Sequence, residues 1–425
     1  MNFSELFLEM YGEIENIPLI DVHEHLNPLK LSHSGFEDII FYHYIVTELV
    51  SAGMSRKEFE KRKGLDKLLY ALPYLRYIRN TATFWCLRQI LSRLHGLDIR
   101  AIDENNWHDV VKVLESSANN ESRAFEVLIK ESKVGKSFLT LSPFSEVKGY
   151  NREVFVGVLR VDNLVSYLSK DSLQSLGGLT GFEISSVEEL DLAIESLFKR
   201  FSEDVVAIAL SPLPEEVYRS VKPSEISLYL KDLMQRGFLA ENPKSLLSSY
   251  ILMKFLDLCN EHKKVFQFML GVERPVSGAA PPDYAITHSK DDQLLNLAQL
   301  FAIYPDVKFD IFIADARLLH PTTVIAKNYH NVYVSGYWWY SMYQTIIRDY
   351  IRIRLEMLPY NKFNGFFSDA YVADWVYGKA TLAKKQLAHV LTELILEGYI
   401  DKSLAIEIAH AVLHKNAENI YKVSI

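Results

Sequence analysis

Short apolar runs and longer amphipathic stretches alternate along most of this 425-residue chain. Short runs rich in β-branched and aromatic residues are typical of buried strands. One such run, Ile17–Val22, lies near the start, and seven more follow the first third of the chain: Ser137–Leu141, Val154–Leu159, Val205–Leu210, Val265–Leu270, Phe309–Ile313, Val332–Ser335 and the weaker Phe363–Ser368. Between most of the later runs, apolar residues recur three and four apart, which predicts helices such as Ser186–Phe201, Pro243–Glu261 and Asp291–Ile303.

Strands that alternate with helices predict a parallel sheet, and eight such units predict a closed TIM (β/α)8 barrel. An open doubly wound sheet is the alternative, but no glycine-rich phosphate loop follows the first strand. We therefore expect one barrel domain over residues 1–425. Residues 35–130 form an all-helical insertion after strand one, residues 131–370 hold strands two to eight, and residues 371–425 form C-terminal helices.

Composition narrows the class of protein. The net charge of −8 is spread without blocks of like charge, which argues against non-specific nucleic-acid binding. Two cysteines, Cys86 and Cys259, make no disulfide framework and suit a reduced cytosol. The acidic start lacks the features of a signal peptide, and no window has the ~20 apolar residues of a membrane helix. We expect a cytoplasmic protein with neither a membrane nor a nucleic-acid partner.

Two histidines follow the first predicted strand. His23 and His25 lie two residues apart, so on a strand both imidazoles project from the same face. Neutral imidazole is a common metal ligand, and divalent zinc, manganese or iron would suit such a pair. The alternative is two surface histidines in a loop. At the end of a barrel strand, the pair instead predicts one metal ion at the barrel mouth.

A carboxylate follows the last predicted strand. In a closed barrel, strands one and eight are neighbours, so Asp369 approaches His23 and His25. Two imidazoles and one carboxylate would leave metal positions open for water or substrate. Asp369 could also accept a proton, or simply cap the helix that begins near Val372.

Other candidates follow the remaining strands. Arg160 and Arg274 could each bind a substrate carboxylate, or form ordinary salt bridges. Trp338 and Trp339 could wall a sugar or pack structurally. His43 and Tyr44, on the first inserted helix, could overhang the mouth, although such residues are more often core or surface.

The order and spacing of several segments resemble those of the uronate isomerase family, metal-dependent TIM barrels of the amidohydrolase superfamily. The resemblance runs nearly end to end, and its motifs are Asp21–Pro28 (family Asp-x-His-x-His-Leu-x-Pro), Tyr42–Tyr44 (Asp-His-Tyr), Leu159–Asp162 (Phe-Arg-Pro-Asp), Gln267–Arg274 (Gln-Leu-His-Ile-Gly-x-x-Arg), Ser335–Trp339 (Gly-Ser-x-Trp-Trp), Phe367–Asp369 (Thr-Asp-Ser-Arg) and Lys415–Tyr421 (Asn-Ala-x-x-Tyr).

The resemblance implies interconversion of aldose and ketose forms of hexuronates. By resemblance, His23, His25 and Asp369 form the metal site, and Asp369 and Tyr44 assist proton transfer between adjacent sugar carbons. The tryptophans and arginines would line a pocket for a small, polar, carboxylate-bearing substrate. The inserted helices could serve as a lid or as the interface of a homo-oligomer.

Several family groups are replaced here. Met269 stands where the family has a histidine in strand five, and Tyr371 stands where it has an arginine two residues after the strand-eight aspartate. Val46 and Thr47 replace the basic residues that follow the family's Asp-His-Tyr. The predicted metal ligands are therefore present, whereas several residues expected in the substrate pocket are replaced. Two further hypotheses follow: a metal-dependent hydrolase of lactones or amides with Asp369 as general base, and a barrel without catalytic activity.

Overall fold

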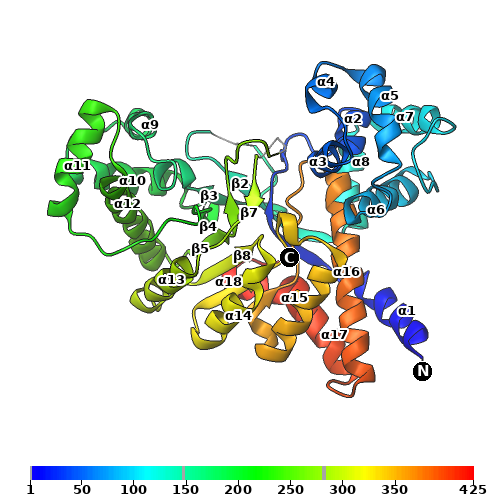
Figure 1. Ribbon diagram of the computed structural model, residues 1–425. Coiled ribbons are helices and arrows are strands. Elements are labelled where there is room, and N and C mark those ends of the chain that lie inside the picture. The colour runs from blue at the N-terminus through cyan, green and yellow to red at the C-terminus, as the bar shows by residue number, and fades with distance from the viewer. Residues whose placement is uncertain (1, 146–148, 280–283) are drawn as a thin grey trace.

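The computed structural model of the chain describes residues 2–145, 149–279 and 284–425. At its centre lies one sheet of eight parallel strands in the order β1-β2-β3-β4-β5-β8-β9-β10 (Figure 1). This order follows the chain without the reversal of a doubly wound sheet, so the barrel prediction is confirmed. The strands are β1 Leu19–Glu24, β2 Val134–Leu141, β3 Phe155–Arg160, β4 Val205–Leu210, β5 Val265–Leu270, β8 Phe309–Ile313, β9 Val332–Ser335 and β10 Phe363–Asn364.

Hydrogen bonds join the first strand to the segment that follows the last. The N–H of Asp369 donates to the carbonyl of His23 at 3.0 Å, and the N–H of His25 donates to the carbonyl of Ala370 at 2.9 Å. The N–H of Ser368 donates to Oδ1 of Asp21 at 2.8 Å. These bonds bring the two ends of the sheet together at its C-terminal edge, where barrel enzymes carry their active sites.

The first and last strands are shifted from the predicted ranges for identifiable reasons. β1 begins at Leu19 because Pro18 has no N–H to donate to a neighbouring strand. β10 ends at Asn364 because the N–H of Gly365 turns to the carbonyl of Val412 instead. A two-stranded antiparallel hairpin, β6 (Val272–Glu273) with β7 (Ile286–Thr287), lies outside the barrel and was not predicted.

Helices fill the long connection between β1 and β2. They gather at the upper right of Figure 1 and include α3, which carries His43 and Tyr44. Their bounds are α2 Phe36–Ile40, α3 His43–Ser51, α4 Arg56–Glu60, α5 Gly64–Leu75, α6 Ala82–Gln89, α7 Trp107–Ser117 and α8 Glu121–Glu126, with π-helical turns η1 Ile90–Leu94 and η2 Val127–Glu131.

A long C-terminal helix, α16 (Ala373–Leu396), links this helical segment to the barrel, because α1, α6, η2 and α15 all pack against it. No helix in the described ranges has both the length and the apolar character needed to cross a membrane. The remaining helices are α1 Phe3–Ile14, α9 Lys170–Thr180, α10 Val187–Phe201, α11 Pro223–Arg236, α12 Glu241–His262, α13 Asp291–Ile303, α14 Leu319–Asn328, α15 Gln344–Met357, α17 Lys402–His410 and α18 Asn416–Tyr421.

A polar network crosses the barrel interior and joins five elements, β5, β8, β9, β10 and α18. Oδ2 of Asp310, in β8, accepts hydrogen bonds from Ser335 at 2.6 Å, from Asn364 at 3.3 Å and from the hydroxyl of Tyr421. The amide of Gln267, in β5, donates to the same hydroxyl at 2.8 Å. All five side chains are buried. Burial raises the pKa of Asp310 to about 6, although these hydrogen bonds and the charge of Arg354 act in the opposite direction.

Candidate functional site

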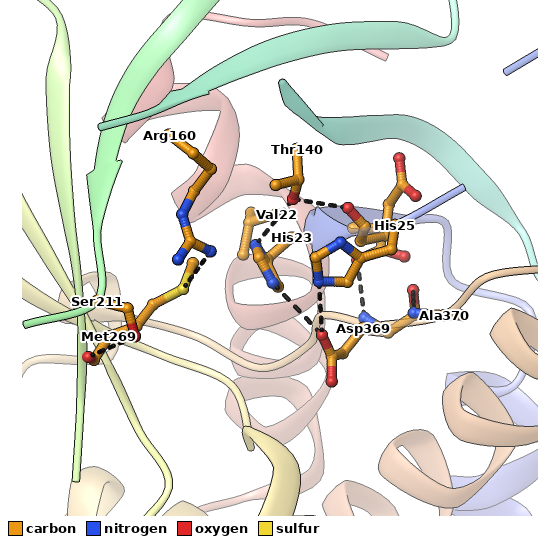
Figure 2. Close-up of polar contacts among 12 residues, drawn as sticks. Val22, His23, His25, Thr140, Arg160, Ser211, Met269, Asp369 and Ala370 are labelled. Atoms are coloured by element: carbon orange, nitrogen blue, oxygen red, sulfur yellow. Dashed lines mark hydrogen bonds and ion pairs between the residues drawn. The ribbon is translucent and has the colours of Figure 1, made fainter. Parts of the chain in front are cut away.

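The three predicted metal ligands meet at the seam between β1 and β10. Oδ1 of Asp369 lies 3.4 Å from Nε2 of His23 and 3.3 Å from Nε2 of His25. Figure 2 shows both imidazoles directed at this one oxygen. Two ligand atoms bound at about 2.1 Å to one tetrahedral ion lie about 3.4 Å apart. Both distances to Oδ1, and the two-nitrogen, one-oxygen chemistry of the three donors, therefore fit a divalent metal ion.

Burial prepares His23 to act as a ligand. Its side chain is almost fully enclosed, and this burial lowers its pKa to about 4, so the ring is neutral near pH 7. Its Nδ1 lies 3.5 Å from the hydroxyl oxygen of Thr140, whose proton is donated to the carbonyl of Glu24. This arrangement favours the proton on Nδ1 and leaves the lone pair on Nε2, the nitrogen that faces Asp369.

Asp369 is not a helix cap. α16 begins at Ala373 with Val372 as the residue before it, and no side chain caps that end, so the capping interpretation is wrong. Burial of Asp369 raises its pKa, but the adjacent His23 and His25 side chains and the nearby charge of Lys379 outweigh this effect and hold the pKa well below its ordinary value. The carboxylate is therefore ionised and available to a cation or as a proton acceptor.

Tyr44 completes the surroundings of this carboxylate. Its hydroxyl donates a 2.6 Å hydrogen bond to Oδ2 of Asp369, the oxygen that faces away from the histidines. The neighbouring His43 packs edge-on against Tyr371, with ring centroids 5.2 Å apart. Burial lowers the pKa of His43 to about 3, so this ring is neutral too. The structure thus brings together five of the side chains singled out in the sequence.

A cavity of about 330 Å³ opens above these groups. Arg160, Arg274, Trp338 and Trp339, the four predicted substrate-binding residues, all lie on its wall. Its full lining is His23, His25, His43, Tyr44, Thr140, Arg160, Asp162, Asn163, Tyr167, Arg274, Trp338, Trp339, Asp369 and Tyr371. Of the residues not singled out beforehand, Thr140 precedes the last residue of β2, and the others follow β3. Their position at strand ends was the available signal.

The two arginines differ in their partners. Arg160 forms a two-pronged salt bridge with Asp162, with both N–O distances 2.7 Å, so its charge is largely neutralised. Arg274 donates to the hydroxyl of Ser211 at 3.3 Å and lies 5.9 Å from the ring centre of Trp339. Arg274 is therefore the better receptor for an incoming anionic group.

Met269 and Tyr371, which stand where the resemblance leads one to expect a histidine and an arginine, each contact a residue of the cavity wall. The sulfur of Met269 accepts a 3.3 Å contact from Nη1 of Arg160, inside the barrel mouth (Figure 2). The ring of Tyr371 stacks on His25 with centroids 5.1 Å apart and planes 12° from parallel. An aromatic ring thus covers one side of His25 where the family resemblance leads one to expect an arginine.

A second group of side chains of the metal-binding type lies where the helical insertion meets α16, and it consists of His33, His95 and Asp374. Its spacing differs from that of the first, because Nε2 of His95 lies only 2.8 Å from Oδ1 of Asp374. The hydroxyl of Ser117 lies 3.2 Å from His33 and 3.3 Å from His95. The 2.8 Å separation is a hydrogen-bond distance, shorter than the 3.3–3.4 Å separations in the first group, and a nitrogen that donates to a carboxylate has no lone pair for a metal. This second group therefore has the geometry of a structural clamp.

Comparison with solved structures gives three close matches in fold. The uronate isomerase of Thermotoga maritima aligns over 98% of this chain and 97% of its own, with a TM-score of 0.88 and 16% identity. The uronate isomerase of Bacillus halodurans C-125 aligns over 100% and 98%, with a TM-score of 0.80 and 19% identity. The glucuronate isomerase of Caulobacter crescentus aligns over 100% and 95%, with a TM-score of 0.88 and 14% identity.

No protein-family model matches the sequence, and no curated protein matches it either. Identities below a fifth over nearly full-length alignments are typical of a distant relationship. The matches nevertheless extend through the inserted helices and the C-terminal helices, and so cover more than the barrel. The resemblance to uronate isomerases seen in the sequence is therefore confirmed at the level of the fold: the chain has the uronate isomerase fold.

Proposed function

We propose that this protein is a metal-dependent isomerase that interconverts the aldose and ketose forms of a hexuronate or a related sugar acid. The observation that carries the proposal is that the two carboxylate oxygens of Asp369 face different partners. Oδ1 faces the two histidines, and Oδ2 accepts the hydroxyl proton of Tyr44. One carboxylate can therefore serve a metal ion and a proton relay together.

His23, His25 and Asp369 would hold one divalent ion, with zinc the expected metal and manganese or iron the alternatives. When bound, such an ion supplies electrophilic stabilisation of the carbonyl and adjacent hydroxyl oxygens of an open-chain sugar. The cavity of about 330 Å³ has room for a six-carbon acid above these residues. Arg274 would receive the carboxylate, and Trp338 and Trp339 would exclude water from one wall.

Isomerisation moves one proton from C2 to C1 and one from O2 to O1. In the proposed reaction, Oδ2 of Asp369 takes the C2 proton while Tyr44 gives its hydroxyl proton to C1. The proton on O2 moves to the adjacent O1, and Asp369 then returns its proton to Tyr44 along the 2.6 Å hydrogen bond. Every proton is accounted for, and both residues end in their starting states.

The test is exchange of the C2 proton. Purified protein loaded with zinc, manganese or iron is incubated in D₂O with a panel of hexuronates, and loss of the C2 proton signal and formation of the ketose are followed by NMR. We expect exchange with at least one uronate, abolished in Asp369→Asn. No exchange with any metal would contradict the isomerase proposal. Hydrolysis of lactones or amides by the same samples would then favour the hydrolase, with Asp369 as base for water.

A further inference from the structure

The main chain at Asp369 has a conformation that needs external support. Its φ is +51°, the left-handed region, which residues with a β-carbon rarely adopt. The N–H of Asp369 donates to His23, and its carbonyl accepts a 2.8 Å hydrogen bond from the hydroxyl of Tyr42. The direction of the carboxylate toward the histidines and Tyr44 depends on this turn. Whatever fixes the turn also fixes the site.

Lys379 supplies much of that support from α16, the helix that follows the turn. Its ammonium group donates to the carbonyl of Ser368 at 2.7 Å, to the carbonyl of Asp369 at 3.2 Å and to the hydroxyl of Tyr42 at 2.7 Å. These three bonds use all three protons of the ammonium group. Two of the acceptors are the consecutive carbonyls of the strained turn, and the third is the hydroxyl that holds the same turn.

The charge of Lys379 is unusual in its surroundings. The side chain is 3% exposed, and no carboxylate oxygen of the described residues lies within 4.0 Å of its nitrogen. The ring of Tyr44 lies 4.7 Å from the ammonium nitrogen and the ring of Tyr42 lies 4.9 Å from it. Burying a cation that has no carboxylate oxygen within hydrogen-bond distance costs folding free energy. Energetically unfavourable arrangements of this kind cluster at functional sites, where the surrounding structure maintains them. The cation lies beneath the aromatic ring and the turn that carry the proton relay.

We propose that Lys379 is a positioning residue of the active centre. It holds the Ser368–Asp369 turn and the ring of Tyr44 so that Asp369 presents Oδ1 to the metal and Oδ2 to the Tyr44 hydroxyl. The proposal rests on the proposed function for its catalytic meaning, whereas its structural content, the support of the turn, stands apart from the reaction. Lys379 touches neither substrate nor metal in this scheme.

The chain contains a matched control on the same helix. Lys384 is also 3% exposed, and its ammonium group also donates to two main-chain carbonyls, those of Glu15 at 3.0 Å and Ile17 at 2.8 Å. These carbonyls lie before β1, at the opposite end of the strand from the histidines. Lys384→Met therefore removes a buried lysine of the same kind without touching the turn at Asp369.

The experiment compares Lys379→Met, Lys379→Arg and Lys384→Met with the wild type. Zinc affinity is measured by competition with a chelator on protein shown to be folded by circular dichroism, and thermal midpoints are recorded beside it. We expect Lys379→Met to weaken zinc binding at least tenfold and to lower kcat, because supporting residues around metal ligands have effects of about 10–100-fold. Lys384→Met should lower the midpoint and leave zinc affinity unchanged, and Lys379→Arg should recover part of the affinity.

Equal zinc affinity in Lys379→Met and Lys384→Met would overturn the proposal. A crystal structure of Lys379→Met, or of Lys379→Arg should the first variant fail to fold, gives a reading that needs neither metal nor substrate. We expect the Asp369 turn to leave the left-handed region and the hydrogen bond from Tyr44 to lengthen. A turn unchanged in that structure would also overturn the proposal. A wild type that binds zinc but exchanges no uronate proton would refute the proposed function alone.

Discussion

The hydroxyl of Tyr44 donates a 2.6 Å hydrogen bond to Oδ2 of Asp369, although 325 residues of chain separate the two. Tyr44 comes from the first inserted helices, and Asp369 follows the last strand of the barrel. The bond therefore couples the helical insertion to the carboxylate that faces His23 and His25. It makes the insertion part of the candidate site, and it is the contact on which the proposed proton relay rests.

Removing this hydroxyl should separate proton transfer from metal binding. Tyr44→Phe keeps the ring but leaves Oδ2 of Asp369 without its donor, so we expect kcat to fall by about 10²–10⁴-fold. Metal content should stay at the wild-type level, because Oδ1 and both histidines are untouched. Tyr304→Phe is the matched control, since the Tyr304 hydroxyl donates to Asp257 at 3.0 Å away from the cavity. A Tyr44→Phe enzyme with wild-type kcat would exclude the relay.

Removing one imidazole should empty the metal site. His25→Ala deletes one of three donor atoms, and we expect elemental analysis to find about one divalent ion per chain in the wild type and almost none in the variant. His95→Ala serves as the control, because His95 belongs to the hydrogen-bonded clamp with Asp374. That variant should keep its metal and lose stability. Metal loss in His95→Ala with retention in His25→Ala would reverse the assignment of the two clusters.

The buried Asp310 should give stability a measurable dependence on pH. Its pKa is raised from 3.8 to about 6 in the folded protein, so the folded state binds more protons than the unfolded state between these values. Its contribution to stability is complete below about pH 4 and is lost as pH rises through about 6. At pH 7 the ionised group costs on the order of 3 kcal/mol relative to the protonated one.

Urea unfolding of the wild type and Asp310→Asn at pH 4.5 and pH 7 tests this expectation. Asparagine does not titrate, so the deficit of the variant relative to the wild type should shrink as pH rises, by about 2 kcal/mol between the two conditions. The same deficit at both pH values would show that Asp310 does not change its protonation in this window.

Gly336, directly after β9, should tolerate no side chain. Its φ is +36°, and a β-carbon would overlap the ring of Phe367 in the barrel mouth. We expect Gly336→Ala to destabilise the protein by about 2–4 kcal/mol, from backbone strain plus overpacking. Gly398→Ala isolates the backbone part, because Gly398 has φ +77° but open space around it. Equal losses in the two variants would mean that the Phe367 ring moves aside freely.

Local pattern was enough to predict much of the barrel. The ranges Val205–Leu210, Val265–Leu270, Phe309–Ile313 and Val332–Ser335 are strands with the same bounds in the structure. Their β-branched and aromatic residues suit a sheet buried on both faces, and that preference acts over a few neighbouring residues. β10 shows the limit of such reasoning, because the N–H of Gly365 is taken by Val412, far along the chain. No local pattern reveals a competitor of that kind.

Within the candidate site, the sequence alone determined which residue types stand at the ends of the strands. His23 and His25 were predicted as metal ligands from their spacing at the end of the first strand, and the barrel argument brought Asp369 near them. Tertiary structure decided which neighbours these groups contact. It left α16 without a cap from Asp369, which was the alternative interpretation of that residue, and it paired the charge of Arg160 with Asp162. It also placed Lys379 beneath the turn. Such outcomes depend on distances between residues remote in sequence and on competition for hydrogen bonds, which only the folded chain settles.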